Sequence, residues 1–436
     1  MPRHLLLRFV VLPALVLFLG GCASARDAED RPTRPSDTGE VEVGVAPDLS
    51  PASVEIATIQ LYPDGQEGQM PILRSGQRNH LTLRFDLLAE RGRPVSVYFY
   101  HADRDWQRDL NPAEYLSGFH RDDILDYSPS EGTEVPFYHY RYQFPNDVVQ
   151  FRISGNYIVR VTEQGMEDEV LFEMPFFVSE ESVGGELGAD YLIGTGGMTL
   201  TQPVLVFQPP RADAANSNDY SACFIRNGRL EESRCATRAS TIEAPALRFY
   251  LPREAAFSPE AADLFLRLGS LQVGSQVERI DFSRSPFFVR LEPDYARFGP
   301  SGITPLQYGQ PVVQAAVRDR ARPAVGAEYV DVQFSLVPAG ESRYAADVHV
   351  IGAFNRWRPA PSNRMIWNSA QGRYEATLMM KQGEYEYTYW SSDRRLRDAM
   401  NNAPPRPENA YQAFVYYDDI RVGTHRLLNV TGVATR

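Results

Sequence analysis

A period-two alternation of apolar and polar residues runs through most of residues 53–178, and no other feature constrains the fold as strongly. Successive side chains of a β-strand point to opposite faces, so this alternation is typical of strands with one buried face. A change of parity between Ile56 and Ile59 predicts a β-bulge. The alternating segments are 53–62, 79–87, 94–101, 137–144, 156–163 and 169–178. Because turn signals separate them, they predict a β-sandwich.

The remainder of the folded chain also reads as strands. Residues 181–325 contain four apolar segments joined by Gly- and Pro-rich connections, and the Gly-rich segment 194–200 reads as a turn because it lacks the residues of a phosphate loop. Alternation resumes after residue 327. The sequence therefore predicts an all-β chain of tandem, Ig-like β-sandwich domains. Their expected bounds are 51–180, 181–325 and 326–436.

The N-terminus has the pattern of an export signal. Arg3 and Arg8 flank a short apolar run that ends in LGGC, and this ending resembles the lipobox of bacterial lipoproteins, in which the cysteine is acylated. We therefore expect a signal peptide at residues 1–21 and a lipid (palmitate) on Cys22. Ala23 after this cysteine favours the outer membrane, and surface exposure stays open as an alternative to the periplasmic face.

Residues 22–50 are polar and rich in Pro and Gly, and we expect a disordered tether behind the lipid anchor. Loss of Arg3 and Arg8 with the signal would change the formal net charge from −12 to −14. Lys381 is the only lysine, and no basic stripe is present. This acidic composition argues against a nucleic-acid partner.

Two further cysteines, Cys223 and Cys235, flank the segment CFIRNGRLEESRC. Its Asn-Gly pair at 227–228 is typical of a hairpin turn, which would bring the two cysteines together. In an exported protein this spacing is compatible with a disulfide bond, and with two free thiols as the alternative.

The stretch 101–127 is crowded with carboxylates and imidazoles around Trp106. Asp103, Asp105 and Glu114 fit part of a calcium-loop register, but Arg108 stands where that loop needs glycine. Asn111 and Glu114 have instead the spacing of a helix capping box, with Pro112 at the first position and Gly118 as the stop. We therefore interpret the stretch as a packed structural or recognition loop and predict no catalytic residue, metal or cofactor.

Several longer motifs carry a family resemblance. QLYPDG (60–65), the stretch 101–127, HYRYQFPND (139–147) and SGNYIVRV (154–161) resemble the first domain of the type IX secretion system plug protein family of Bacteroidota and relatives. The C-terminal segments 351–357, 372–389 and 408–419 resemble the closing sandwich of that family.

This resemblance implies a non-enzymatic, periplasmic subunit that binds the large outer-membrane β-barrel translocon of type IX secretion. Such a subunit closes the inner mouth of the barrel when no substrate is passing. Aromatic side chains are enriched at protein interfaces. From the signature stretch and the adjacent aromatic strand we select these partner-binding candidates: Trp106, Tyr115, Phe119, Tyr127, Tyr138 and Tyr140.

An alternative function is glycan binding. The segment 346–357 resembles the glycogen-binding E-set module of AMP-activated kinase β subunits and branching enzymes. Trp357 stands at the first tryptophan position and Asn409 is the candidate for the asparagine, but Thr388 replaces the lysine and the second tryptophan is missing. Loss of a stacking ring and a cation would weaken sugar binding. An enzyme is a third class, for which the sequence has no nucleophile elbow and no metal-spaced histidine pair.

Overall fold

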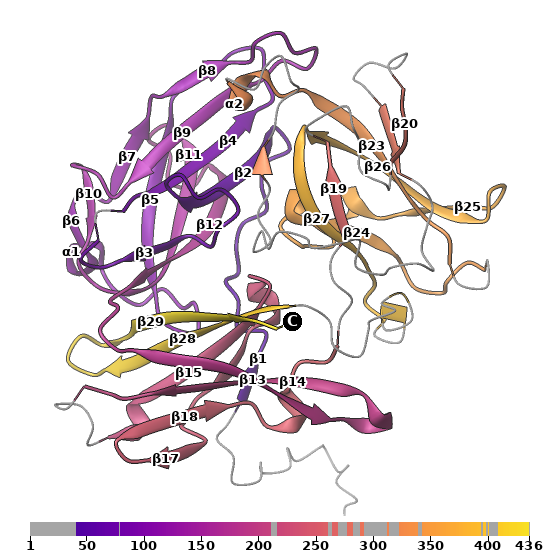
Figure 1. Ribbon diagram of the computed structural model, residues 1–436. Coiled ribbons are helices and arrows are strands. Elements are labelled where there is room, and N and C mark those ends of the chain that lie inside the picture. Colours follow the sequence, from indigo (N-terminus) through magenta and orange to yellow (C-terminus); the bar gives the residue numbers. More distant parts are fainter. Residues whose placement is uncertain are drawn as a thin grey trace, which may run out of the picture. The chain divides into compact units, whose positions relative to one another are not determined.

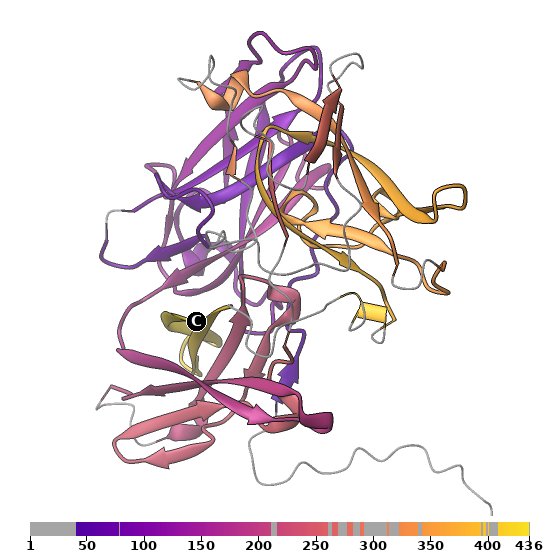
Figure 2. The same ribbon diagram turned by 45° about the vertical axis from the view of Figure 1, so that its right-hand side comes forward.

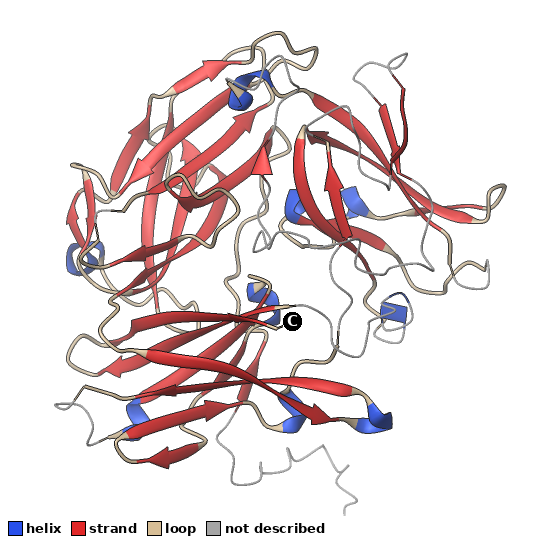
Figure 3. Cartoon of the chain, in the orientation of Figure 1, coloured by secondary structure: helices blue, strands red, loops and turns tan. Residues whose placement is uncertain are grey.

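In the described residues β-strands are the main regular secondary structure, and the helices are short (Figure 3). A computed structural model describes residues 41–77, 79–210, 216–259, 264–268, 277–281, 288–291, 312–313, 322–338, 342–393, 396–397, 400 and 409–435. Residues 1–21 and Cys22 lie outside these residues. Among the residues described, no helix is both long and apolar enough to cross a membrane. The prediction of an all-β chain is confirmed.

The first sandwich spans residues 56–179 and contains two main sheets, with strand orders β2-β4-β9-β8 and β3-β12-β11-β5-β7, and a small sheet β10-β6 (Figure 1). Alternating side chains such as Leu81, Leu83 and Phe85 point into its core and are fully buried. The predicted bulge is present, because the β2–β4 register shifts between Ala57 and Gln60. Its elements are β2 Ile56–Pro63, β3 Ile72–Arg74, β4 Leu81–Leu87, β5 Val95–Ala102, α1 Pro112–Tyr115, β6 Leu116–Gly118, β7 Arg121–Ile124, β8 Tyr127–Pro129, β9 Tyr138–Phe144, β10 Val149–Phe151, β11 Gly155–Glu163 and β12 Val170–Ser179.

The middle sandwich is assembled from three separate parts of the chain. Its sheets have the orders β1-β16-β15-β28-β29 and β13-β14-β18-β17, and they enclose one apolar core. Figure 2 shows the yellow C-terminal strands beside the pink strands of this sandwich. Its strands are β1 Val41–Val43, β13 Gly185–Ile193, β14 Thr199–Phe207, β15 Tyr220–Arg226, β16 Arg234–Ala236, β17 Thr241–Glu243, β18 Ala246–Tyr250, β28 Ala410–Asp419 and β29 Thr424–Ala434.

The inserted sandwich lies in sequence between β18 and β28 of the middle sandwich. It contains the sheet β20-β21-β23-β26-β25 and the sheet β19-β27-β22, to which β24 is added, with a core of its own. Its elements are β19 Leu264–Arg267, β20 Val277–Asp281, β21 Phe288–Leu291, β22 Val312–Val313, α2 Pro323–Gly326, β23 Tyr329–Leu336, β24 His349–Gly352, β25 Ile366–Asn368, β26 Arg373–Lys381 and β27 Gly383–Trp390.

Strand pairing corrects two of the expected boundaries. The expected third domain, 326–436, loses β28 and β29 to the middle sandwich, because β28 pairs with β15. The expected middle domain, 181–325, in turn loses β19, β20, β21 and β22. Strands β19 and β22 pair with β27, β21 pairs with β23, and β20 pairs with β21. Alternation marks where strands form but not which distant strand each one pairs with, so neither exchange follows from the local pattern.

The C-terminal end of the expected tether, residues 41–50, is folded. Strand β1 pairs with β16, and the side chain of Leu49 is buried. Arg358 of the inserted sandwich donates to the backbone carbonyls of Pro47 and Leu49, at 3.3 and 3.2 Å. This polar segment is bonded largely through its backbone, so its side-chain composition did not indicate that it is folded.

Cys223 and Cys235 form a disulfide bond in the middle sandwich. They are directly paired residues on the antiparallel neighbours β15 and β16, with their Cα atoms 3.9 Å apart. Asn227 and Gly228 of the connecting loop both adopt left-handed backbone conformations, with φ of 51° and 71°. This is the conformation that favours an Asn-Gly pair in a hairpin turn.

Candidate functional site

The acidic stretch 101–127 begins with a tight turn after β5. The carboxylate Oδ1 of Asp103 accepts hydrogen bonds from the backbone N–H groups of Asp105 and Gln107, at 2.9 and 2.8 Å. The N–H of Asp103 donates to the carbonyl of Gln107 at 2.9 Å. Carboxylates that bond to nearby backbone N–H groups fix turns of this kind. Asp103 therefore has a structural function in this turn.

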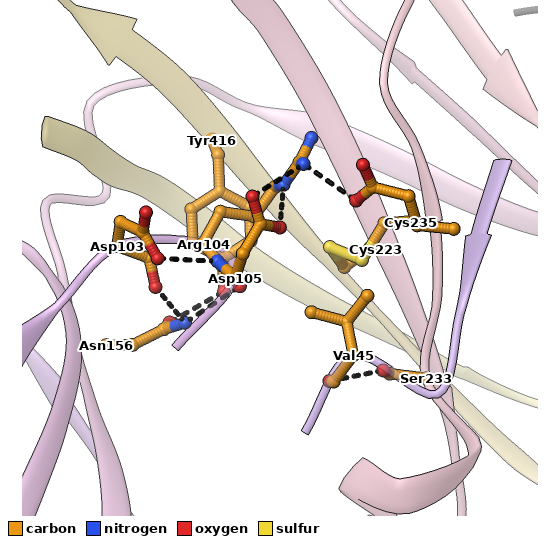
Figure 4. The surroundings of a disulfide bond; sticks show 10 residues. Val45, Asp103, Arg104, Asp105, Asn156, Cys223, Ser233, Cys235 and Tyr416 are labelled. Atoms are coloured by element: carbon orange, nitrogen blue, oxygen red, sulfur yellow. Dashed lines mark hydrogen bonds and ion pairs between the residues drawn. A yellow bond between two sulfur atoms is a disulfide. The ribbon is translucent and has the colours of Figure 1, made fainter. Parts of the chain in front are cut away.

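The turn is also bonded to the middle sandwich near the disulfide (Figure 4). The side-chain amide of Asn156 donates to the carbonyl of Asp103 at 2.9 Å, and its oxygen accepts from the Tyr416 hydroxyl at 2.7 Å. Arg104 is buried and donates to Glu42 of strand β1 at 2.7 Å. The first part of the stretch thus joins two sandwiches.

Trp106 is buried at this joint, although we predicted it as a partner-binding residue. Its ring packs edge-on against Phe177, with the ring centroids 5.5 Å apart. Both side chains belong to one apolar cluster, called here the shared cluster, because the first and middle sandwiches both contribute to it. Its members are Leu49, Met70, Ile72, Ala102, Trp106, Ile158, Phe177, Cys223, Ile225, Cys235, Phe414, Tyr416, Leu427 and Val430.

His101 has structural partners on both ring nitrogens. Nδ1 lies 2.7 Å from Asp109 Oδ1, and Nε2 lies 3.3 Å from the carbonyl of Ser154. The other carboxylate oxygen of Asp109 accepts from the hydroxyl of Thr424 in β29. Burial raises the pKa of Asp109, but the bonds from His101 and Thr424 outweigh burial and hold its pKa below the ordinary value. This group therefore acts as a further bond between the first and middle sandwiches.

The predicted capping box is confirmed. Asn111 Oδ1 accepts from the N–H of Ala113, and the Glu114 carboxylate accepts from the N–H of Asn111 at 2.8 Å. The helix ends at Tyr115, before Gly118. Within the part of the chain that the structure describes, no group of three or more His, Cys, Asp or Glu side chains is arranged to hold a metal ion.

Five of the six predicted partner-binding residues lie in or against the core of the molecule. Tyr115 and Tyr140 are fully buried, and the Tyr115 hydroxyl donates to the carbonyl of Phe99 at 2.8 Å. Tyr127 and Tyr138 are half-buried against the same core as Tyr140. Tyr115 ends helix α1 and Tyr140 lies on the core-facing side of β9. The prediction of an interface from aromatic content was therefore wrong for Tyr115 and Tyr140, as for Trp106.

Phe119 is the exception among the six. Its side chain is 70% exposed, while its backbone N–H donates to the carbonyl of Val148 at 2.9 Å. Gly118 before it has φ of 117°, and a Cβ atom there would lie 2.1 Å from the same carbonyl oxygen. The backbone is therefore fixed while the ring faces solvent. Leu125, near the other end of the stretch, is similarly exposed at 68%.

The two glycan candidates both have partners within the fold. The guanidinium of Arg229 lies 3.9 Å from the ring centroid of Trp357, over the ring. Asn409 is buried in the middle sandwich, where its oxygen accepts from the Asn227 amide at 2.7 Å. The fold itself therefore engages both the ring of Trp357 and the amide of Asn409.

Sequence reasoning also missed a buried ionic group. Lys381, the only lysine of the chain, donates to Asp86 at 2.6 Å, and each side chain is 1% exposed. One signal was available, since a lone lysine in an otherwise arginine-only chain marks an unusual position. Its partner could not be found, because the two residues lie 295 positions apart.

Comparisons with known proteins agree with this architecture. Residues 56–180 match the family described as the type 9 secretion system plug protein 1st domain. The crystal structure of a hypothetical protein from Parabacteroides merdae superimposes with a TM-score of 0.80 at 24% identity, covering 89% of this chain and 99% of that one. This likeness shows a shared fold. Among curated proteins none matches the chain.

The matched residues coincide with the first sandwich and include the whole stretch 101–127. The match relates the protein to type IX secretion and to the cell envelope. Residues 56–180 of this chain are therefore similar to the first domain of type IX secretion system plug proteins.

Proposed function

We propose that this protein is a non-enzymatic subunit that binds the outer-membrane translocon of type IX secretion from the periplasmic side and closes its inner mouth between substrates. The observation that carries the proposal is the match of residues 56–180 to the plug protein family. The hydrogen bonding of the signature stretch supports the non-enzymatic part. Asp103, His101 and Glu114 are engaged by backbone or side-chain groups and serve the fold.

A plug needs a body that does not deform under load. The shared cluster supports this requirement, because it makes the first and middle sandwiches one apolar unit. Several polar bonds surround the cluster. Among them, Arg426 of β29 forms an ion pair with Glu180 at 2.6 Å.

We further propose that Cys22 carries a lipid that holds the protein at the outer membrane. Strand β1 is the first described element after Cys22, and it pairs with the middle sandwich next to the disulfide. A lipid on Cys22 would thus connect to the fused first and middle sandwiches. Incorporation of labelled palmitate into the wild-type protein, and none into Cys22→Ala, is the expected result.

For the contact with the barrel we propose the surface around Phe119. A large exposed aromatic ring within a polar rim is the usual composition of an interface hot spot. Exposed polar residues adjoin it in the sequence, among them Glu114 and Arg121. The other aromatic candidates are left out because the fold itself uses them.

The test is a pull-down of the tagged full-length protein from native outer membrane in mild detergent, with the bound proteins identified by mass spectrometry. We expect one very large β-barrel at a ratio near one to one. Recovery of the protein alone, from a membrane that contains such a barrel, would refute the proposed function.

Phe119→Asp tests the contact surface, with Leu125→Asp as the matched control of nearly equal exposure. We expect Phe119→Asp to lose the barrel and Leu125→Asp to retain it. If both variants retain the barrel while the wild type binds it, the function stands and the contact at Phe119 is wrong.

A further inference from the structure

The first sandwich makes one kind of contact with the middle sandwich and a different kind with the inserted sandwich. Among the described residues, no apolar core cluster contains members of both the first and the inserted sandwich. One ring pair bridges them, Phe137 with Tyr329, at a centroid distance of 5.5 Å. The other contacts that join them are mainly polar.

A buried ionic network is at the centre of this contact. Lys381 of β26 donates to Asp86 of β4 at 2.6 Å, and the Tyr329 hydroxyl donates to the same carboxylate oxygen at 2.7 Å. His139 Nδ1 lies 2.8 Å from the other oxygen, and Thr58 lies 2.7 Å from the Tyr329 hydroxyl. Burial raises the pKa of Asp86, but Lys381 and His139 outweigh burial and hold its pKa below the ordinary value.

A second polar contact lies beside this network. Glu328 of the inserted sandwich accepts hydrogen bonds from the backbone N–H groups of Glu134 and Val135, at 2.6 and 3.3 Å. The N–H of Glu131 donates to the carbonyl of Val325 in α2 at 2.9 Å. Three amides of the first sandwich therefore have acceptors that belong to the inserted sandwich.

This composition decides which contact can open. Buried ions and amides can be hydrated again when two surfaces part, whereas separated apolar cores lose their burial with no such compensation. Interfaces that open and close between domains are accordingly more polar than permanent ones. The inserted sandwich also has a complete core of its own, so it does not need the first sandwich to stay folded.

We propose that the inserted sandwich is a separable body that undocks from the first sandwich as a unit, and that the Asp86–Lys381 pair is the latch that holds the docked state. The first and middle sandwiches stay fused during this motion through the shared cluster. The inference does not depend on the identity of the partner in secretion.

Native-state hydrogen exchange of the full-length protein in detergent, read by mass spectrometry, tests the proposal. Undocking removes the acceptors of the amides at 131, 134 and 135 but leaves the ladders of β11 and β12 intact. Lys381→Met leaves Asp86 charged without its ionic partner. We expect it to accelerate exchange at 131–135 by at least about a hundredfold, and exchange in β11 and β12 to stay unchanged.

Asp419→Asn is the matched control, because it breaks the ion pair of another buried carboxylate, with Arg426, inside the middle sandwich. It should leave exchange at 131–135 unchanged. Tyr329→Phe is the milder variant, which removes only the hydroxyl, and we expect about tenfold acceleration at the same amides. Small-angle X-ray scattering should show a larger radius of gyration for Lys381→Met.

Two results would overturn the proposal. Equal acceleration at 131–135 and in β11 and β12 would mean that the sandwiches unfold as one unit. Unchanged exchange at 131–135 in both Lys381→Met and Tyr329→Phe would mean that the pair is no latch. Tyr329→Phe alone decides between these outcomes if Lys381→Met does not fold.

Discussion

The first sandwich has two neighbours and joins each by different chemistry. It meets the middle sandwich through the shared cluster, in which rings such as Phe177 and Phe414 lie 4.7 Å apart. It meets the inserted sandwich through the Asp86–Lys381 pair and the carboxylate of Glu328. The first contact resembles the inside of a domain, and the second resembles the interface of a complex that opens.

The difference teaches where the effective domain boundaries lie. By the continuity of the chain, the inserted sandwich is part of the middle sandwich, since β18 precedes it and β28 follows it. By the continuity of the apolar core, the first and middle sandwiches form one body and the inserted sandwich forms another. Because burial of apolar surface dominates stability, the second division should govern unfolding.

The largest expected effect tests this fused body. Phe414→Ala removes a fully buried ring from the shared cluster and should lower the free energy of unfolding by about 3–5 kcal/mol. In chemical denaturation the first and middle sandwiches should still unfold in one transition. The fluorescence of Trp106 in the same cluster reports this transition, alongside the tryptophans of the inserted sandwich.

Phe334→Ala is the control for that experiment, because Phe334 is equally buried in the core of the inserted sandwich. It should destabilise the inserted sandwich and leave hydrogen exchange in the shared cluster unchanged. Separate transitions of the first and middle sandwiches in Phe414→Ala would contradict the idea of one fused body.

The disulfide provides the next test. It closes a loop of 12 residues, and replacing both Cys223 and Cys235 with alanine should lower the free energy of unfolding by about 3 kcal/mol. Both cysteines belong to the shared cluster, so the loss should appear in the transition of the fused body. Equilibrium denaturation with and without reductant measures it. An effect confined to the amides at 131–135 would contradict this assignment.

Glu328→Gln tests the polar contact between the first and inserted sandwiches, and its expected effect is of intermediate size. The carboxylate accepts hydrogen bonds from two backbone N–H groups of the first sandwich. An amide side chain has only one oxygen that can accept such bonds. We expect the docked state to lose about 1.5–3 kcal/mol, with no change in the transition of the fused body. Hydrogen exchange at 131–135 measures the stability of the docked state, and exchange in β11 measures the stability of the fused body. Equal effects at both sites would argue for a single cooperative molecule.

These contacts also explain how far the sequence could be interpreted. The six longer strands of the first sandwich, the bulge at Ala57 and the capping box at Asn111 follow from local patterns, and the structure contains all of them. The short strands β6, β7 and β8 lie in or at the end of the stretch 101–127, which we interpreted as a loop, and they were not predicted. The exchange of β28 and β19 between sandwiches was not predictable, because strand pairing depends on residues far away in the chain.

The candidate site was predicted only in part for a similar reason. Trp106 and Phe119 are both large aromatic residues of one loop, yet one is buried and the other is 70% exposed. Residue type does not separate an interface ring from a core ring, since aromatic residues are enriched in both places. Only the positions of the middle sandwich and of the Val148 carbonyl distinguish the two residues.

The smallest expected effect concerns an ion pair at the rim of the same polar contact. Arg322 and Glu131 bridge the inserted and first sandwiches, but their side chains are 61% and 53% exposed. Exposed pairs contribute about 0–1 kcal/mol and are screened by salt. Glu131→Gln should therefore leave hydrogen exchange at 134–135 nearly unchanged, whereas Lys381→Met in the buried centre accelerates it strongly. If Glu131→Gln matched Lys381→Met, and the effect disappeared at high salt, long-range attraction between the two bodies would hold the docked state, and the buried pair would not be its latch.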